Sequence, residues 1–383
     1  MEAEFGAPLW FFGIGSYAFL ADGRIVCAYG KDGMMHLGLL QPDDGRVEEL
    51  EVSHVPGELP MMCSIGTRLV YVGASPTEDM AVVSLDVETG ATEVLARSME
   101  EEIPRKYISV PRAIEFPTDG GLSAHALYYA PANEDFEGPA EERPPLIVMS
   151  HGGPTGQASA ELDPRTQFWT SRGFAVVDVN YGGSSGYGRA YRERLRGQWG
   201  VVDTNDCLNA ARHLVQIGEV DGDRLAIRGG SAGGYTTLCA LTFHDLFATG
   251  ASYFGVADTE TLDEDTHKFE SRYLEGLIGP YPETADLWKE RSPINEVDQL
   301  SCPVILFQGL EDKIVPPSQA EEMVAALERK GIPYAYLAFE GEQHGFRRAE
   351  TIIRTLEAEL YFYGRILRFE PADELEPVEI HNL

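Results

Sequence analysis

The sequence predicts an α/β fold, in which helices cover both faces of a mostly parallel sheet, behind a small all-β segment. From about residue 108 onwards, short apolar runs end in polar or glycine-rich loops and alternate with helical patterns. Before that point, strand-like patterns repeat about every 44 residues. With 383 residues, of which 43% are hydrophobic, the chain can bury a full α/β core and a small appendage.

The repeat lies in the first of three expected parts. These parts are a β segment over residues 1–107, an α/β domain over 108–370 and an acidic tail over 371–383 that need not be ordered. A period of about 40 to 45 residues corresponds to one four-stranded propeller blade, so two blades are expected. Propellers close with roughly four to eight blades. The sequence is therefore either a fragment or a natural short form, and its unpaired blade edges favour a homo-oligomer.

Ser231 lies between Gly229 and Gly233, where an apolar strand pattern passes directly into a helical pattern. This is the context of a nucleophile elbow, in which small residues on either side of the serine prevent clashes in a strained turn. Ser231 is therefore the nucleophile candidate. The alternative is a passive serine in a glycine-rich turn.

The same G-x-S-x-G pattern occurs again at Gly182, Ser184 and Gly186, also after an apolar run. Polar and glycine residues follow it, which is typical of a loop that enters an exposed helix. Small and apolar residues suited to a buried helix follow Ser231 instead. The context favours Ser231 over Ser184.

A serine nucleophile needs a base and an acid that orients the base. Asp312 follows the buried strand pattern at 303–309, and His344 follows the strand pattern at 335–339. The chain order Ser, Asp, His and the position after strand ends are those of α/β hydrolases. Asp312 is therefore the acid candidate and His344 the base candidate.

Two glutamates compete with these assignments. Glu311 adjoins Asp312, and periodicity alone does not separate them; both could also be solvated loop carboxylates. Glu342 lies too near His344 in sequence to be the obvious orienting acid, and we expect it to serve its own loop.

The stretch 145–155 is an apolar strand pattern that breaks at His151, Gly152 and Gly153. Hydrolases of this fold take one oxyanion donor from such a loop and another from the residue after the nucleophile. The backbone N–H groups of Gly153 and Ala232 are the expected donors, with Gly152 as the alternative to Gly153. A simple turn is the competing interpretation.

The pocket is less well specified by sequence. Tyr253 and Phe254, at the end of a predicted strand, are candidate pocket walls, although such aromatic residues are more often core. The aromatic-rich segment 258–291 is expected to cover the acyl or side-chain pocket.

From about Ile114 to Phe369, the chain resembles the catalytic domain of the prolyl oligopeptidase family, especially its acylaminoacyl peptidase and dipeptidyl aminopeptidase branch. The matching motifs are HGGPTG, NYGGSSGYG with the following Trp199, Gly200 and Asp203, GGSAGGY, QGLEDKIVPP and EGEQHGF. The resemblance implies an α/β-hydrolase fold and a triad of Ser231, Asp312 and His344.

The chain departs from this family in two positions. His151 stands where some members place an oxyanion-hole tyrosine, which implies donors from the backbone only. Gly182 stands where many members have arginine. Members also carry a large propeller whose charged groups commonly recognise the peptide terminus, and two blades leave little material for that role.

The sequence therefore predicts a serine hydrolase of peptidase ancestry that acts on a small ester or a short peptide through an acyl-enzyme. Esterase activity is expected to be the easiest to detect, because the site is expected to be open. The alternatives are a carboxylesterase with little peptidase activity and a catalytically silent binding module. Activity should fall in acid, because neutral imidazole is the working base.

Composition excludes other classes of protein. Lys and Arg total 30 against 62 Asp and Glu, and the net charge of −32 argues against nucleic acid and anionic membrane surfaces as partners. Five scattered cysteines predict reduced thiols and a cytoplasmic location. No cofactor motif, metal-ligand cluster or apolar stretch of about 20 residues appears in the sequence. The apolar run 8–20 lacks the basic start of a signal peptide and is expected to form blade strands.

Overall fold

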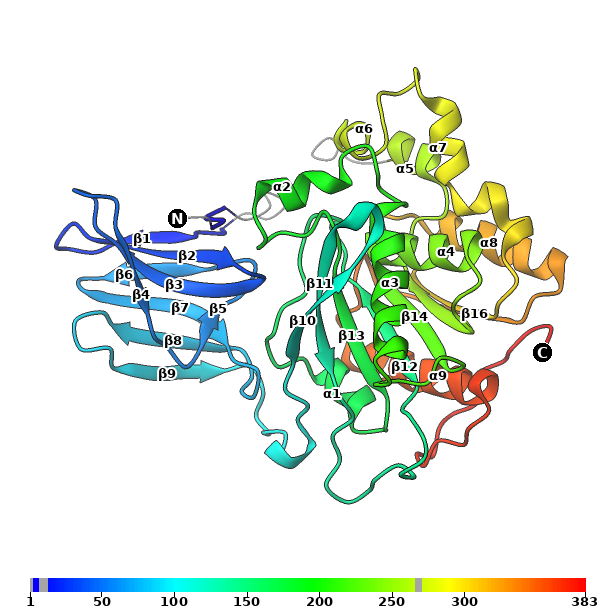
Figure 1. Ribbon diagram of the computed structural model, residues 1–383, viewed down its shortest axis with the longest axis horizontal. Helices are drawn as coiled ribbons and strands as arrows, with labels where there is room; N and C mark the ends of the chain where they lie inside the picture. The colour runs from blue at the N-terminus through cyan, green and yellow to red at the C-terminus, as the bar shows by residue number, and fades with distance from the viewer. Residues whose placement is uncertain (1–2, 7–12, 266–270) are drawn as a thin grey trace.

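The computed structural model, shown in Figure 1, describes residues 3–6, 13–265 and 271–383. Its centre is an eight-stranded sheet with the strand order β10-β11-β13-β12-β14-β15-β16-β17. The strands from β13 to β17 in this order run parallel, and β10 and β11 add antiparallel pairs at one edge. The predicted α/β fold is confirmed. The strands are β10 (Arg112–Pro117), β11 (Ser123–Tyr129), β12 (Leu146–Ser150), β13 (Ala175–Asn180), β14 (Leu225–Gly230), β15 (Thr249–Tyr253), β16 (Val304–Gly309) and β17 (Tyr334–Phe339).

Helices cover both faces of this sheet (Figure 1). On one face, α3, α4 and α8 bury side chains such as Leu208, Leu238 and Met323 against the strands. On the other face, α1 and α9 bury Trp169 and Phe362. Because neighbouring strand residues point to opposite faces and both faces are covered, the central strands are mostly apolar and largely buried, with few polar exceptions such as Asp178 and Arg228. The helices are α1 (Pro164–Thr170), α2 (Arg189–Arg192), α3 (Val202–Gln216), α4 (Ala232–Phe243), α5 (Thr259–Asp265), α6 (Tyr273–Leu277), α7 (Ala285–Arg291), α8 (Pro317–Lys330) and α9 (Ala349–Leu367), with short 3-10 turns η1 (Arg105–Tyr107), η2 (Asp119–Gly121), η3 (Glu193–Leu195) and η4 (Pro293–Gln299).

The N-terminal part forms two antiparallel sheets, drawn in blue to cyan in Figure 1. One holds β1 to β4, and the other holds β6 to β9 with the short β5. Side chains from both sheets, including Val26, Leu37, Leu69 and Val83, share one core, so the predicted all-β segment is confirmed. Its strands are β1 (Tyr17–Phe19), β2 (Ile25–Lys31), β3 (Met34–Leu40), β4 (Val47–Leu50), β5 (Val55–Pro56), β6 (Met62–Ile65), β7 (Arg68–Ala74), β8 (Ala81–Asp86) and β9 (Thr92–Arg97).

Strand β1 falls within the apolar run 8–20, of which residues 8–12 lie outside the described residues. Tyr17, Phe19 and Ile65 are exposed on β1 and β6. Association with a second copy stays a prediction.

The β segment contacts the α/β part directly. The Glu4 carboxylate accepts hydrogen bonds from the Gly186 backbone and the Arg192 guanidinium. The Leu162 N–H donates to the Ser75 carbonyl at 2.8 Å. These contacts bring loops of the β segment close to the loops that follow the carboxyl ends of the strands, where the candidate site lies.

The chain beyond α9 returns to the sheet. His381 and Tyr334 of β17 exchange backbone hydrogen bonds of 2.8 and 3.1 Å, and Arg172 pairs with Asp373 at 2.7 Å. Part of the acidic tail therefore contacts the α/β part, at β17 through His381 and next to α1 through Asp373. All five cysteines are free thiols. Within the described ranges, every helix is too short or too polar to cross a membrane.

Candidate active site

Ser231 occupies a sharp turn between β14 and α4, with φ of 57° and ψ of −121°. A residue with a side chain rarely adopts this conformation, so the turn costs on the order of 1–3 kcal/mol. A Cβ atom at Gly229 would lie 2.3 Å from the Gly233 carbonyl oxygen, and one at Gly233 would lie 2.0 Å from the Ser150 carbonyl oxygen. Both flanking glycines are therefore required for the strand to pass into the helix at Ser231.

Three side chains from separate loops meet at this turn. His344 Nε2 lies 2.8 Å from Ser231 Oγ, and His344 Nδ1 lies 2.8 Å from Asp312 Oδ2. Since a carboxylate only accepts hydrogen bonds, Nδ1–H donates to Asp312, and Nε2 is left to accept the serine proton. The other oxygen, Asp312 Oδ1, accepts the N–H groups of Ile314 and Val315 at 2.9 and 3.0 Å. The arrangement can remove a proton from Ser231 and stabilise the resulting imidazolium.

Neither competing glutamate reaches the imidazole. Glu311 is exposed, and its backbone N–H donates to the Glu342 carbonyl. The buried Glu342 carboxylate accepts the N–H groups of Arg347 and Arg348 at 3.0 and 3.1 Å. Glu342 therefore holds the loop that carries His344, as the sequence predicts.

The second serine of the same pattern lies elsewhere. Ser184 is completely buried, and its Oγ lies 2.6 Å from His151 Nε2. It is not brought to His344 or Asp312. The geometry thus separates the two motifs in the way that their flanking residues predict.

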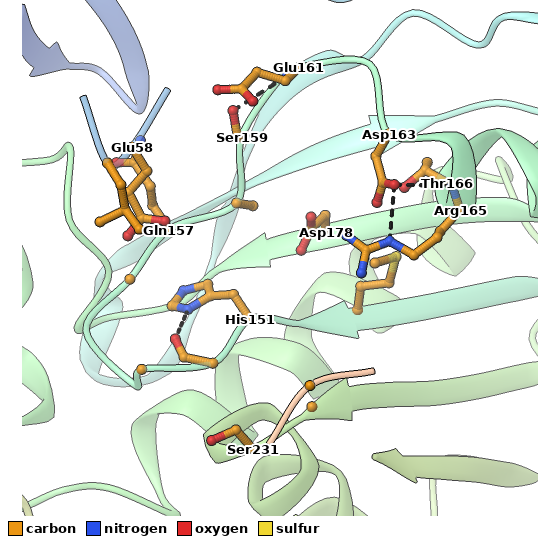
Figure 2. A pocket seen from close by; sticks show the side chains of 18 of the residues that line it. Glu58, His151, Gln157, Ser159, Glu161, Asp163, Arg165, Thr166, Asp178 and Ser231 are labelled. Atoms are coloured by element: carbon orange, nitrogen blue, oxygen red, sulfur yellow. Dashed lines mark hydrogen bonds and ion pairs between the residues drawn. The ribbon is translucent and has the colours of Figure 1, made fainter. Parts of the chain in front are cut away.

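A cavity of about 1270 Å³ opens over Ser231 (Figure 2). It is lined by His344 and Phe254, by much of the stretch 149–166, and by β-segment residues that include Glu58. The Phe254 ring meets the His344 ring edge-on at 4.9 Å, so Phe254 is a wall of this cavity. Tyr253 lies behind it, donates its hydroxyl to buried Glu359 and lines a smaller cavity of about 240 Å³.

The segment 258–291 does not line the large cavity in the part that the structure describes. Its Tyr273 hydroxyl lies 3.0 Å from Thr155 Oγ1 instead, and it donates to the Gly153 carbonyl at 3.4 Å. For this cavity, the expectation that the segment covers the pocket is wrong. The segment packs against the glycine-rich loop, and the β segment supplies the wall.

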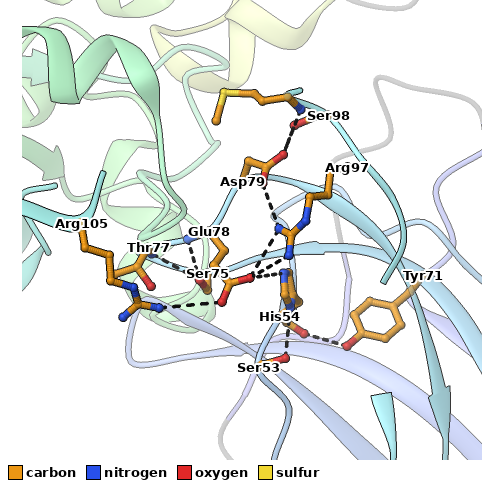
Figure 3. A network of polar contacts seen from close by, with 11 residues as sticks. Ser53, His54, Tyr71, Ser75, Thr77, Glu78, Asp79, Arg97, Ser98 and Arg105 are labelled. Atoms are coloured by element: carbon orange, nitrogen blue, oxygen red, sulfur yellow. Dashed lines mark hydrogen bonds and ion pairs between the residues drawn. The ribbon is translucent and has the colours of Figure 1, made fainter. Parts of the chain in front are cut away.

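The cavity is rich in carboxyl groups that the sequence did not single out. These are Glu58, Asp79, Glu161, Asp163 and Asp178, and Arg165 is the one Lys or Arg that lines the cavity in the part of the chain that the structure describes. Two of them are already engaged. Asp79 accepts hydrogen bonds from Arg97, Ser98 and the Met99 backbone at 2.9 to 3.2 Å (Figure 3). Asp163 accepts from Arg165 at the start of α1.

Glu58 and Glu161 have no such cation among the described residues. Glu58 Oε1 is buried without a hydrogen-bond partner in that part of the chain. Burial, and to a lesser extent the Glu161 charge, raise the pKa of Glu58 to about 7. Burial also raises the pKa of Glu161. Across the cavity (Figure 2), burial and then Asp163 raise the pKa of Asp178 to about 7.

The glycine-rich loop reaches the nucleophile. A Cβ atom at Gly152 would lie 3.2 Å from the Gly230 carbonyl oxygen and 3.6 Å from Ser231 Cβ. The loop therefore lies against Ser231, where a backbone donor would meet an oxyanion. Gly153 and Ala232 remain the predicted donors.

Comparison with known proteins assigns residues 160–370 to the model of the prolyl oligopeptidase family. Dipeptidyl aminopeptidase BIII of Pseudoxanthomonas mexicana is 35% identical over 227 residues, which are 58% of this chain and 33% of that protein. A puromycin-hydrolyzing peptidase of Mycobacterium tuberculosis superposes with a TM-score of 0.96 at 48% identity, over 100% of this chain and 57% of that one. A puromycin hydrolase superposes with a TM-score of 0.95 at 43% identity, over 99% of this chain and 57% of that one. The chain thus spans about a third of the length of this curated relative and little more than half of these solved chains.

Proposed function

The chain belongs to the prolyl oligopeptidase family, and on that premise we propose that it hydrolyses amide bonds in short peptides and aminoacyl compounds that carry a free amino group. The observation that carries the proposal is the Glu58 carboxyl group, whose buried Oε1 has no hydrogen-bond partner among the described residues and which lines the same cavity as Glu161 and Ser231. The similar puromycin hydrolases make puromycin the first substrate to test.

The reaction would proceed by acyl transfer in two halves. Ser231 attacks the carbonyl carbon while His344 takes its proton, and Asp312 stabilises the imidazolium. The backbone N–H groups of Gly153 and Ala232 meet the oxyanion. His344 then gives its proton to the leaving amine, and water hydrolyses the acyl-enzyme by the same route.

The Glu58 and Glu161 carboxylates favour a cationic substrate group. A Cβ atom at Gly57 would lie 2.7 Å from Glu161 Oε1, and one at Gly156 would lie 3.0 Å from Glu58 Oε1. Both carboxyl groups therefore lie close to glycine backbone, and no Lys or Arg side chain of the described residues pairs with either of them. An incoming ammonium group would supply the missing donors through charge-assisted hydrogen bonds. In this proposal the β segment supplies, through Glu58, the group that binds the substrate's amino terminus.

Substitution of Glu58 tests this preference for a free amino group. In Glu58→Gln, kcat/KM for an aminoacyl anilide should fall roughly 10- to 100-fold, since a hydrogen bond to a charged group contributes about 1.5–3 kcal/mol. Hydrolysis of the N-acetylated anilide and of p-nitrophenyl acetate should be unchanged. Glu93→Gln, on the exposed strand β9, is the matched control. An equal loss on all three substrates would contradict the assignment of Glu58.

The same group predicts a pH dependence of KM. Because the pKa of Glu58 is raised to about 7, its carboxyl is neutral below that pH and charged above it. KM for the free-amine substrate should therefore rise as pH falls through about 7. Titration of the substrate itself affects both proteins alike, so the ratio of KM in Glu58→Gln to KM in the unsubstituted protein should shrink in acid. A ratio that is constant with pH would contradict the prediction.

A further inference from the structure

The second G-x-S-x-G segment packs against the loop that carries the predicted oxyanion donor. The Tyr181 hydroxyl donates to the Pro154 carbonyl at 2.7 Å. Ser185 Oγ donates to the Thr155 carbonyl at 2.8 Å. Tyr181 also stacks on the His151 ring, with centroids 4.3 Å apart and an interplanar angle of 17°. One segment therefore holds the loop at several points.

Ser184 and His151 form the central contact between these two segments. Ser184 is completely buried, so its hydroxyl cannot meet a substrate. Its Oγ lies 2.6 Å from His151 Nε2, while His151 Nδ1 lies 2.9 Å from the Gly152 carbonyl oxygen. A carbonyl only accepts, so Nδ1 carries the proton and Nε2 accepts from the Ser184 hydroxyl. Burial lowers the pKa of His151 to about 4, which agrees with the neutral ring that this pattern requires.

The Gly152 carbonyl belongs to the same peptide group as the Gly153 N–H. This peptide is trans, since the cis bonds of the described chain are Gly153–Pro154 and Tyr281–Pro282. In a planar trans peptide, C=O and N–H point in opposite directions. The His151 ring therefore fixes the direction of the Gly153 N–H by holding the carbonyl at the other end. A carbonyl that accepts a hydrogen bond also makes its N–H a better donor.

We propose that His151 and Ser184 are positioning residues that orient the Gly152–Gly153 peptide, so that its N–H meets the oxyanion formed at Ser231. The proposal rests on the proposed function. It gives the second motif a role: its serine holds the oxyanion loop and performs no chemistry.

Ser184→Ala and His151→Phe test the proposal. The first removes the hydroxyl, and the second removes both ring nitrogens but keeps an aromatic ring beside Tyr181. In each variant, kcat should fall roughly 10- to 100-fold with KM nearly unchanged, less than the roughly 100- to 1,000-fold cost of deleting a donor outright. The inhibition constant of a peptide aldehyde, which forms a tetrahedral adduct, should rise by the same factor as kcat/KM falls. Binding of an N-methylated, uncleavable peptide should not change.

Further variants separate positioning from damage to the fold. Ser109→Ala removes the hydroxyl of another buried serine, which donates to the Ala130 carbonyl at 2.6 Å outside the cavity, and should keep full activity. His151→Asn retains an amide donor near the Nδ1 position and should recover part of the kcat lost in His151→Phe. Rates are normalised to the fraction of protein that a fluorophosphonate finally labels, so a poorly folding variant still gives a kcat for its folded molecules.

Unchanged kcat in both Ser184→Ala and His151→Phe would overturn the proposal. Equal weakening of the aldehyde and of the uncleavable peptide would also overturn it, because a positioned oxyanion donor acts on the tetrahedral state alone. If kcat of His151→Asn were no higher than kcat of His151→Phe, the role assigned to the Nδ1 hydrogen bond would be wrong. Full activity in Ser231→Ala would instead refute the proposed function itself, so the two failures are distinguishable.

Discussion

Ser231→Ala is expected to lower kcat by about a millionfold, the scale seen when the nucleophile of a serine triad is removed. The loss follows from the geometry, because Ser231 Oγ is the group that His344 Nε2 contacts at 2.8 Å. Steady-state hydrolysis of puromycin or of an aminoacyl anilide measures it. The melting temperature should change little, because alanine keeps the Cβ atom and the turn. Activity within tenfold of the unsubstituted protein would refute Ser231 as nucleophile.

Asp312→Asn is expected to lower kcat by about ten-thousandfold near neutral pH. The two backbone N–H groups at Asp312 Oδ1, from Ile314 and Val315, require an acceptor and so select the amide oxygen of asparagine. The amide NH2 group then faces His344 Nδ1, which must accept. The imidazole proton moves to Nε2, where it faces Ser231 Oγ. A ring protonated there cannot take the serine proton.

The matched control for this change is Glu311→Gln. It neutralises the neighbouring exposed carboxylate, which does not meet the imidazole, and should leave kcat within about twofold. If Asp312→Asn were as mild as Glu311→Gln, or if Glu311→Gln were the damaging change, the assignment of the acid would be wrong.

The parts of this molecule that the sequence predicts are those governed by local rules. A side chain at Gly229 or Gly233 would clash with nearby backbone atoms. Because this requirement is local to the turn, a short sequence motif is enough to predict it. Asp312 follows β16, which is buried along its whole length, and His344 follows the neighbouring strand β17 at the side of the sheet. Parallel strands bring the loops at their carboxyl ends together.

The wall of the cavity could not be predicted, because it depends on contacts between distant segments. Glu58 lies in a loop between β5 and β6 and meets the cavity through packing of the β segment on the α/β part. Nothing in its neighbouring sequence distinguishes it from the other acidic residues. The place of segment 258–291 could not be predicted for a related reason. Its aromatic content indicates that it is buried, but it does not indicate which part of the molecule the segment packs against. Strand β10 was not identified either, since its largely exposed residues form no continuous apolar run.

The central claim is that Ser231 is the nucleophile of a serine hydrolase. A fluorophosphonate probe, followed by proteolysis and mass spectrometry of the labelled peptide, tests it most directly. The account predicts one adduct, on Ser231, that forms in step with the loss of hydrolytic activity. An adduct on Ser184 or on another residue, or complete inactivation with Ser231 unmodified, would contradict it.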